Sequence, residues 1–287
     1  MIESSLPNGR FTLFRYFILN LMFCVLLSAN EHNDTSYSSN EFSKTQKLVL
    51  TNVAVASGVL IWGFTQWGYG EEDFHADDEG WFEKETSNGG SDKLGHIYTN
   101  YLITRLLAPL YEDWGYTNED AALYASFTSI LASGILIEVG DGFSEHGFST
   151  EDFIADVIGA GLGYVLATNP DLAKKIDFRV EYNPFLDTDN VTDFTTDYER
   201  MKHLLAIKAE GFELFEDNYM KYMELHLGYY SRNFNHNSTP VEDRERNIYV
   251  GIGINLSSLL RPHIGNYSKI FNYYQVPYTY VEAKKEF

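Results

Sequence analysis

The sequence predicts an α+β protein, with an N-terminal bundle of about four apolar helices followed by a C-terminal antiparallel β-sheet or partial barrel. Two observations support this fold class. Apolar side chains recur with the period of a helix between residues 44 and 170, and beyond residue 170 they alternate as in a strand. We therefore predict a helical domain at 44–170 and an antiparallel β domain at 171–287.

The N-terminus has the features of a signal peptide over residues 1–29, because two arginines precede the apolar stretch 17–29. This stretch is too short for a comfortable membrane span. It contains the only cysteine, Cys24, so lipidation of Cys24, cleavage near residue 29 and an uncleaved anchor are three alternatives. Residues 30–43 are polar and predict a disordered tether. These features predict a cell-envelope location, periplasmic and membrane-associated, at either the inner or the outer membrane.

The composition limits the partners that the protein can have. The formal net charge is −20, and a surface this acidic repels phosphate backbones, so we expect no nucleic-acid binding. The same charge favours cations. Aromatic residues make up 16% of the chain, which is typical of β-rich or membrane-interface proteins.

The helical domain contains long apolar stretches that predict its helices. A long loop, residues 66–90, follows the first of them, and loops of this length are usually functional or flexible. The predicted helices are residues 45–64, 92–110, 121–139 and 149–167.

Polar residues mark where three of these helices begin. Ser91 or Asp92 is the predicted N-cap of the second helix, Asn118 of the third and Ser149 of the fourth, because their side chains can accept bonds from free backbone N–H groups. Asp152 stands where a capping box would place its second member.

Two glycines in the fourth helix, Gly159 and Gly163, predict the close approach of another helix. A dinucleotide-binding loop is the weaker interpretation, because the glycines lie inside an apolar helix and do not follow a strand.

The C-terminal half contains segments in which alternate residues are apolar. They are residues 178–182, 202–212, 222–230, 248–256 and 274–281, and the polar segment 235–246 predicts a hairpin loop. Aromatic strands with a second face of glycine and polar residues also occur in outer-membrane barrels, but five strands are fewer than the about eight that a barrel needs. A sheet packed on the helices, or a partial barrel, is therefore the favoured prediction.

Ionisable residues at the ends of the apolar helices predict the functional site. A charge beside an apolar stretch costs free energy unless it has a partner, so these residues are expected to meet at one end of the bundle. The expected cluster is Asp92, His96, Glu138, Asp141 and Asp152. The wider set of predicted ligand-binding residues is Asp92, Lys93, His96, Tyr101, Glu138, Asp141, Asp152 and Asp156.

Three interpretations of this cluster remain open. The first is a divalent metal site formed by His96, Glu138, Asp141 and Asp152, because imidazole and carboxylates bind Zn, Mn or Fe. The second is acid–base catalysis by His96, assisted by Asp92 or Glu138. The third is a structural network of helix caps and ion pairs.

The motifs Asp92-Lys93-x-Gly-His96, Glu138-x-x-Asp141-Gly and Ser149-x-x-Asp152 occur in order in this chain. In this arrangement residues 45–170 resemble the YfiM-like family of predicted periplasmic lipoproteins, a domain of unknown function, and more distantly VanZ-like membrane proteins. The chain departs from the family pattern at Asp156, where the family has Asn. The resemblance implies a place in the cell envelope and a site, but no reaction.

Taken together, these features predict an exported, membrane-associated cell-envelope protein. Its polar pocket is expected to bind an envelope lipid, a glycan or a protein partner. The alternative is a metal-dependent hydrolase or transferase acting on an envelope lipid or glycan.

Overall fold

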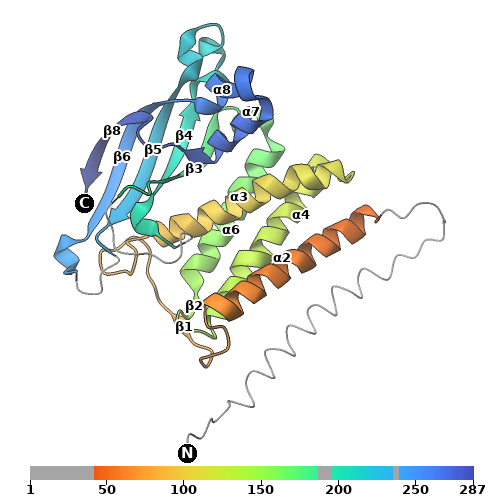
Figure 1. The fold of residues 1–287 in the computed structure, drawn as a ribbon, viewed down its shortest axis with the longest axis vertical. Coiled ribbons are helices and arrows are strands. Elements are labelled where there is room, and N and C mark those ends of the chain that lie inside the picture. The colour runs from red at the N-terminus through yellow and green to blue at the C-terminus, as the bar shows by residue number, and fades with distance from the viewer. Residues whose placement is uncertain (1–41, 187–195, 235–238) are drawn as a thin grey trace, which may run out of the picture.

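The computed structural model describes residues 42–186, 196–234 and 239–287. The predicted signal peptide, Cys24 and nearly all of the predicted tether lie outside these residues. In the described part, helices form one half of the molecule and a twisted sheet the other, which confirms the α+β class (Figure 1).

All of the predicted helices are present. They are α2 (Lys44–Gln66), α3 (Ser91–Asp113), a continuous rod of α4 (Asn118–Ile130), the π-helix η1 (Leu131–Ile137) and α5 (Glu138–Asp141), and α6 (Thr150–Thr168). The predicted bundle is only partly confirmed. Helices α3, α4 and α6 pack on one another, whereas α2 lies at the outside and packs mainly on η1 (Figure 1).

Two of the three predicted N-cap residues differ from those in the structure. Ser149 caps α6 as expected, since its Oγ accepts from the N–H of Asp152 at 3.2 Å. The N-cap of α4 is Thr117 and not Asn118, which is already helical. The N-cap of α3 is Gly90 at φ 82°, so Asp92 is free to point its carboxylate elsewhere.

The close approach predicted from Gly159 and Gly163 is confirmed. A Cβ on Gly159 would lie 2.2 Å from the carbonyl oxygen of Ile97, and one on Gly163 would lie 2.6 Å from Cβ of Thr104. Both neighbours belong to α3, so the two glycines determine how closely α3 and α6 pack.

The sheet has six strands in the order β7-β3-β4-β5-β6-β8, and all neighbours are antiparallel except β3 and β7. The bounds are β3 (Ile176–Tyr182), β4 (Met201–Lys208), β5 (Met223–Arg232), β6 (Glu245–Ile254), β7 (Tyr274–Gln275) and β8 (Tyr280–Glu286). The predicted tail strand is therefore two strands, and β5 and β6 form the predicted hairpin. Short helices fill the connections: α7 (Pro170–Ala173), α8 (Leu256–Ile264), η2 (Tyr198–Arg200), η3 (Ala209–Gly211), η4 (Glu213–Phe215), η5 (Tyr219–Tyr222), η6 (Val241–Asp243) and η7 (Gly265–Asn272).

The two faces of the sheet are used in an unexpected way. On β5 and β6 the polar and aromatic face is buried, with His226 and Tyr249 at 0% and 2% exposure. The aliphatic face is open, with Val250 and Ile252 at 50% and 58% exposure. Helix α3 covers only the part of this face near β3 and β4, where Phe178 packs on Tyr101.

Several charged groups of the buried polar face pair with one another. The guanidinium of Arg179 donates to Glu224 at 2.7 and 2.9 Å and to Asp177 at 3.0 Å. Lys208 adds a second bond to Asp177 at 2.9 Å, and His226 lies 2.8 Å from Glu224. Buried charges need such partners, so this network allows the aliphatic face to remain outside.

Candidate functional site

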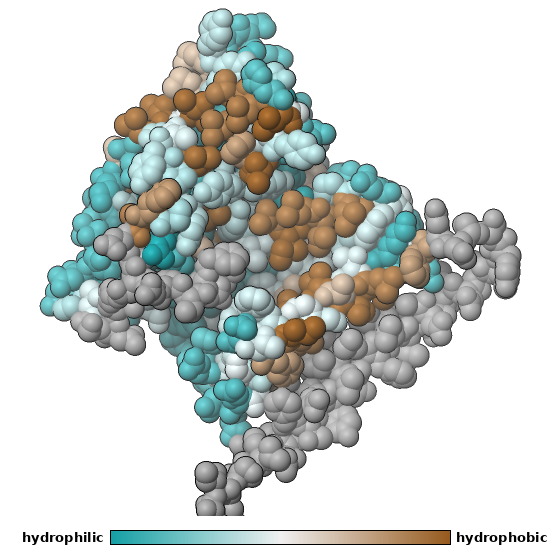
Figure 2. Space-filling view, in the orientation of Figure 1, coloured by the Kyte–Doolittle hydropathy of each residue, from teal (hydrophilic) through white to brown (hydrophobic). Residues whose placement is uncertain are grey.

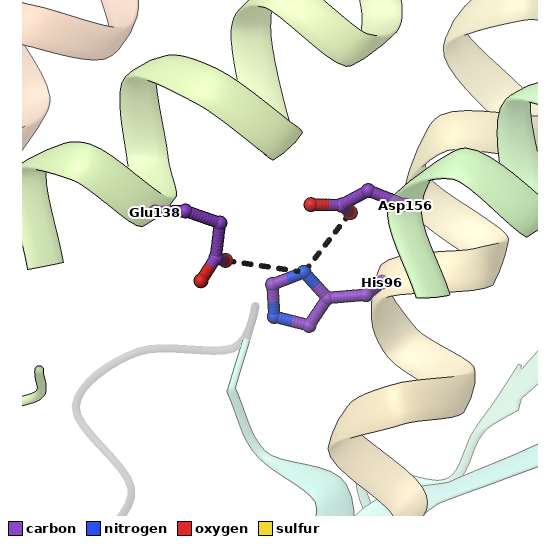
Figure 3. A group of neighbouring side chains, drawn as sticks. All are labelled: His96, Glu138 and Asp156. Carbon is purple, nitrogen blue, oxygen red and sulfur yellow. Dashed lines mark hydrogen bonds and ion pairs between the residues drawn. The ribbon is translucent and has the colours of Figure 1, made fainter. Parts of the chain in front are cut away.

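The residues predicted to converge do meet at one end of the helices, around the imidazole of His96. Its Nδ1 lies 3.0 Å from Oδ1 of Asp156 and 3.8 Å from Oε1 of Glu138 (Figure 3). Its Nε2 lies 3.7 Å from Oδ1 of Asp152. Two helical segments, α5 and α6, thus place acids around a ring that a third, α3, carries.

The local structure explains these positions. Asp152 and Asp156 are four residues apart on α6, so they share one helix face. Glu138 directly follows the π-helix η1, and π-helical turns are frequent at functional sites because they change which side chains face inward. The backbone N–H of Ser149 donates to Oε2 of Glu138 at 3.3 Å, which ties the start of α6 to α5.

Lys93 forms the centre of a second group beside the first. Its Nζ lies 2.6 Å from Oε2 of Glu79, 2.8 Å from Oδ2 of Asp92 and 2.8 Å from Oδ1 of Asp152. Lys93 is 1% exposed, so this ammonium is a built-in counter-ion for three carboxylates. Asp152 connects the two groups.

Glu79 did not belong to the predicted cluster. It lies in the loop 66–90, and this loop is held against the helices by the short parallel pair β1 (Ala76–Asp77) and β2 (Phe148–Ser149). The only signal in the sequence was the acidic character of the loop.

Asp156 is held by two further residues that were not predicted as part of the site. Oγ of Ser133 donates to Oδ1 of Asp156 at 2.8 Å, and Nδ2 of Asn100 donates to the same oxygen. Asn100 is four residues after His96, so a polar residue on that face of an apolar helix was an available signal. Oδ2 of Asp156 is buried and has no hydrogen-bond partner among the described residues.

Burial and the mutual proximity of these groups shift their pKa values. Burial opposes a charge on His96, but the hydrogen bond to Asp156 and the nearby carboxylates outweigh it and raise the pKa of His96 to about 10. Burial, reinforced by neighbouring acids and opposed by His96, raises the pKa of Glu138 to about 9. Near neutral pH the cluster therefore combines a charged imidazolium with a protonated Glu138.

The other acids of the cluster differ from one another. Burial raises the pKa of Glu79 to about 7 and that of Asp141 to about 6. Burial would also raise the pKa of Asp152, but His96 and Lys93 outweigh it and lower that pKa below its usual value. Asp152 is therefore the ionised acid between two cations.

A cleft of about 580 Å³ opens next to His96. Its polar end contains His96, Asp141 and His146. Its apolar wall includes Trp62, which lies in α2, and Trp67, which directly follows α2. Asp141 thus borders the same cleft as His96. The remaining lining residues are Gly58, Val59, Gly95, Thr99, Ser133, Ile137, Thr196 and Tyr198.

Tyr101 is the one predicted site residue that the structure does not bring to the cluster. It is buried between α3, α6 and β3, where its ring packs on Phe178 and Tyr273. The reason is helical geometry, because a residue five positions after His96 points about 140° away from it around the helix.

Among the described residues, two groups of side chains have the geometry to hold a metal ion. In each, the ligand atoms lie within 4.8 Å of one another: His96, Glu138 and Asp156 in the first, and Glu79, Asp92 and Asp152 in the second. The first group differs from the predicted metal set, because Asp156 takes the place of Asp141 and Asp152 beside Nδ1 of His96.

One comparison with known proteins gives a match, and it falls in the helical half of the chain. Residues 78–168 match the model of a family described as Predicted periplasmic lipoprotein (DUF2279), and this range contains the whole cluster. No curated protein and no solved structure matches the chain. Over residues 78–168 the chain is therefore similar to this family of predicted periplasmic lipoproteins.

Proposed function

We propose that this is a membrane-associated envelope protein that binds one lipid in the cleft beside His96. The observation that carries the proposal is the two-sided character of the cleft. Its wall of Trp62, Trp67, Val59 and Ile137 suits an acyl chain, and its polar end at His96 suits a headgroup.

The apolar surface of the helices supports a position at a membrane. Among the described residues, two helical segments, Lys44–Gln66 and Asn118–Asp141, are long and apolar enough to cross a membrane. Only 11% of the most apolar stretch of Lys44–Gln66 is buried inside the protein. Figure 2 shows apolar side chains along α2 and the neighbouring end of α3, where Ile61 and Leu106 are 66% and 56% exposed. Exposed apolar patches of this kind mark interaction surfaces.

The charges at the polar end favour one class of headgroup. Six acids surround the two cations Lys93 and His96, and even with Glu138 protonated the acids outnumber these cations, so an anionic phosphate alone would be repelled. An amine-bearing or hydroxyl-rich headgroup can donate to these carboxylates. The predicted alternative, a metal-dependent hydrolase or transferase on such a lipid, would need in addition a metal ion beside the headgroup.

Native mass spectrometry of the full chain purified in mild detergent tests the proposal. We expect one retained lipid per chain, with an ethanolamine phospholipid as the first added probe. Thr99→Trp, which fills the cleft from α3, should abolish retention. Leu106→Trp, on the same helix but outside the cleft, should leave it unchanged.

Retention that survives Thr99→Trp, or its absence from the unaltered chain under conditions that preserve folding, would refute lipid binding in this cleft. Capture of a protein in place of a lipid would support the partner-binding alternative and would also contradict the proposal.

A further inference from the structure

We propose that His96, Glu138 and Asp156 bind one divalent transition-metal ion, with Zn²⁺ as the reference cation. The ligand atoms are Nδ1 of His96, one carboxylate oxygen of Glu138 and both carboxylate oxygens of Asp156, and water would complete the coordination. A nitrogen ligand with two carboxylates favours Zn²⁺ or Mn²⁺ over Ca²⁺ and Mg²⁺, which prefer oxygen alone.

The distances are close to those that a metal ion requires. Ligand atoms about 2.0–2.2 Å from a shared ion lie roughly 3–3.5 Å from each other. Nδ1 of His96 is 3.0 Å from Oδ1 of Asp156 and 3.8 Å from Oε1 of Glu138. The ligand atoms of the three residues all lie within 4.8 Å of one another, and Figure 3 shows both acids pointing toward the ring from different helices.

A second observation points to a missing cation. Asp156 is 0% exposed, and its Oδ2 has no hydrogen-bond partner among the described residues. A buried carboxylate oxygen without a partner is costly, and a cation bound by both oxygens of Asp156 would satisfy it.

The surroundings of these ligands resemble the supporting shell of a metal site. Ser133 and Asn100 donate to Asp156 and fix its orientation. Asp152 faces Nε2 of His96 at 3.7 Å, on the side of the ring opposite to the proposed metal. A carboxylate at that nitrogen holds a metal-bound histidine in the correct tautomer.

The neighbouring acidic group serves as an internal comparison. Glu79, Asp92 and Asp152 have similar spacing, but Nζ of Lys93 lies within 2.8 Å of all three. That group already contains a cation, so no metal is assigned to it. The metal site shares His96 with the lipid cleft but needs no lipid, so the two proposals can fail separately.

The test is metal binding by the untagged full chain after treatment with a chelator. Equilibrium dialysis against Zn²⁺, read by elemental analysis, should give about one ion per chain. Asp156→Asn and Glu138→Gln should each weaken binding by roughly 100-fold or more, since even changes in the supporting shell cost 10–100-fold. Asp92→Asn, a matched change in the Lys93 group, should leave the affinity within about threefold.

Cobalt(II) absorption provides a readout that a merely structural role would not change. Folded His96→Cys protein should still bind Co²⁺ and should show a new thiolate-to-cobalt charge-transfer band. The proposal is overturned if the unaltered chain binds no ion, if Asp92→Asn loses binding as fully as Asp156→Asn, or if folded His96→Cys shows no such band. Lipid retention by native mass spectrometry is scored separately.

Discussion

Replacing Gly159 by alanine tests the packing that brings the site together. The new Cβ would lie 2.2 Å from the carbonyl oxygen of Ile97 and 2.8 Å from its carbonyl carbon. These are backbone atoms that no rotamer change can move, so α3 and α6 must separate. Overpacking of this kind costs about 1–3 kcal/mol, and the clash with backbone places this case at the upper end.

Helix propensity acts in the opposite direction. Alanine is better than glycine inside a helix by about 1 kcal/mol, so the net loss for Gly159→Ala is about 2 kcal/mol. Gly161→Ala is a matched control in the same helix, because its Cβ would meet nothing within 4 Å. It should gain up to about 1 kcal/mol, which leaves the two variants about 3 kcal/mol apart.

Urea unfolding in one detergent at fixed concentration measures this difference. Because Ile97 is next to His96, Gly159→Ala should also weaken metal binding, and Gly161→Ala should not. Equal free energies of unfolding for the two variants would refute the close contact between α3 and α6.

Three further changes test other parts of the account. Burial, with no opposing partner, lowers the pKa of His203 from 6.5 to about 3. As the pH falls between these two values, His203 is therefore protonated in the unfolded chain but remains neutral in the folded chain. The free energy of unfolding should therefore fall by up to about 1.4 kcal/mol per unit below pH 6.5, and His203→Phe should remove that part of the slope in urea titrations. Lys93→Met leaves three carboxylates without their cation and should cost about 3–5 kcal/mol in the same assay, whereas a loss below 1 kcal/mol would contradict the counter-ion role. Ile61→Lys, on the exposed face of α2, should reduce membrane association in flotation assays without lowering the melting temperature, and an unchanged floated fraction would exclude that face from the contact.

The helices could be predicted because their signals are local. Apolar periodicity and polar caps identified four helices, and Ser149 was assigned to the correct cap. The sheet shows the limit of such signals. Alternation predicts that β6 has two different faces, but it does not reveal that Tyr249 is buried and Ile252 exposed, since that choice depends on the buried ion network around Arg179.

The site followed from the cost of isolated charges, which does not depend on knowing the fold. The cost of an unpaired charge identifies His96, Glu138 and Asp152 from the sequence. It does not identify Glu79, because the position of Glu79 depends on the pairing of two short strands. It also missed Ser133, which the π-helical turn η1 directs toward Asp156. Tyr101 lies apart from the cluster, because a residue five positions after His96 faces another side of α3.

The central claim is that the cleft beside His96 holds a lipid, and photo-crosslinking in cells tests it most directly. A benzophenone amino acid in place of Thr99 should form an adduct with one lipid species, identified by mass spectrometry. The same group in place of Glu112, exposed on α3 away from the cleft, should not enrich that species. An adduct with protein alone at Thr99, or the same lipid mixture at both positions, would contradict the account.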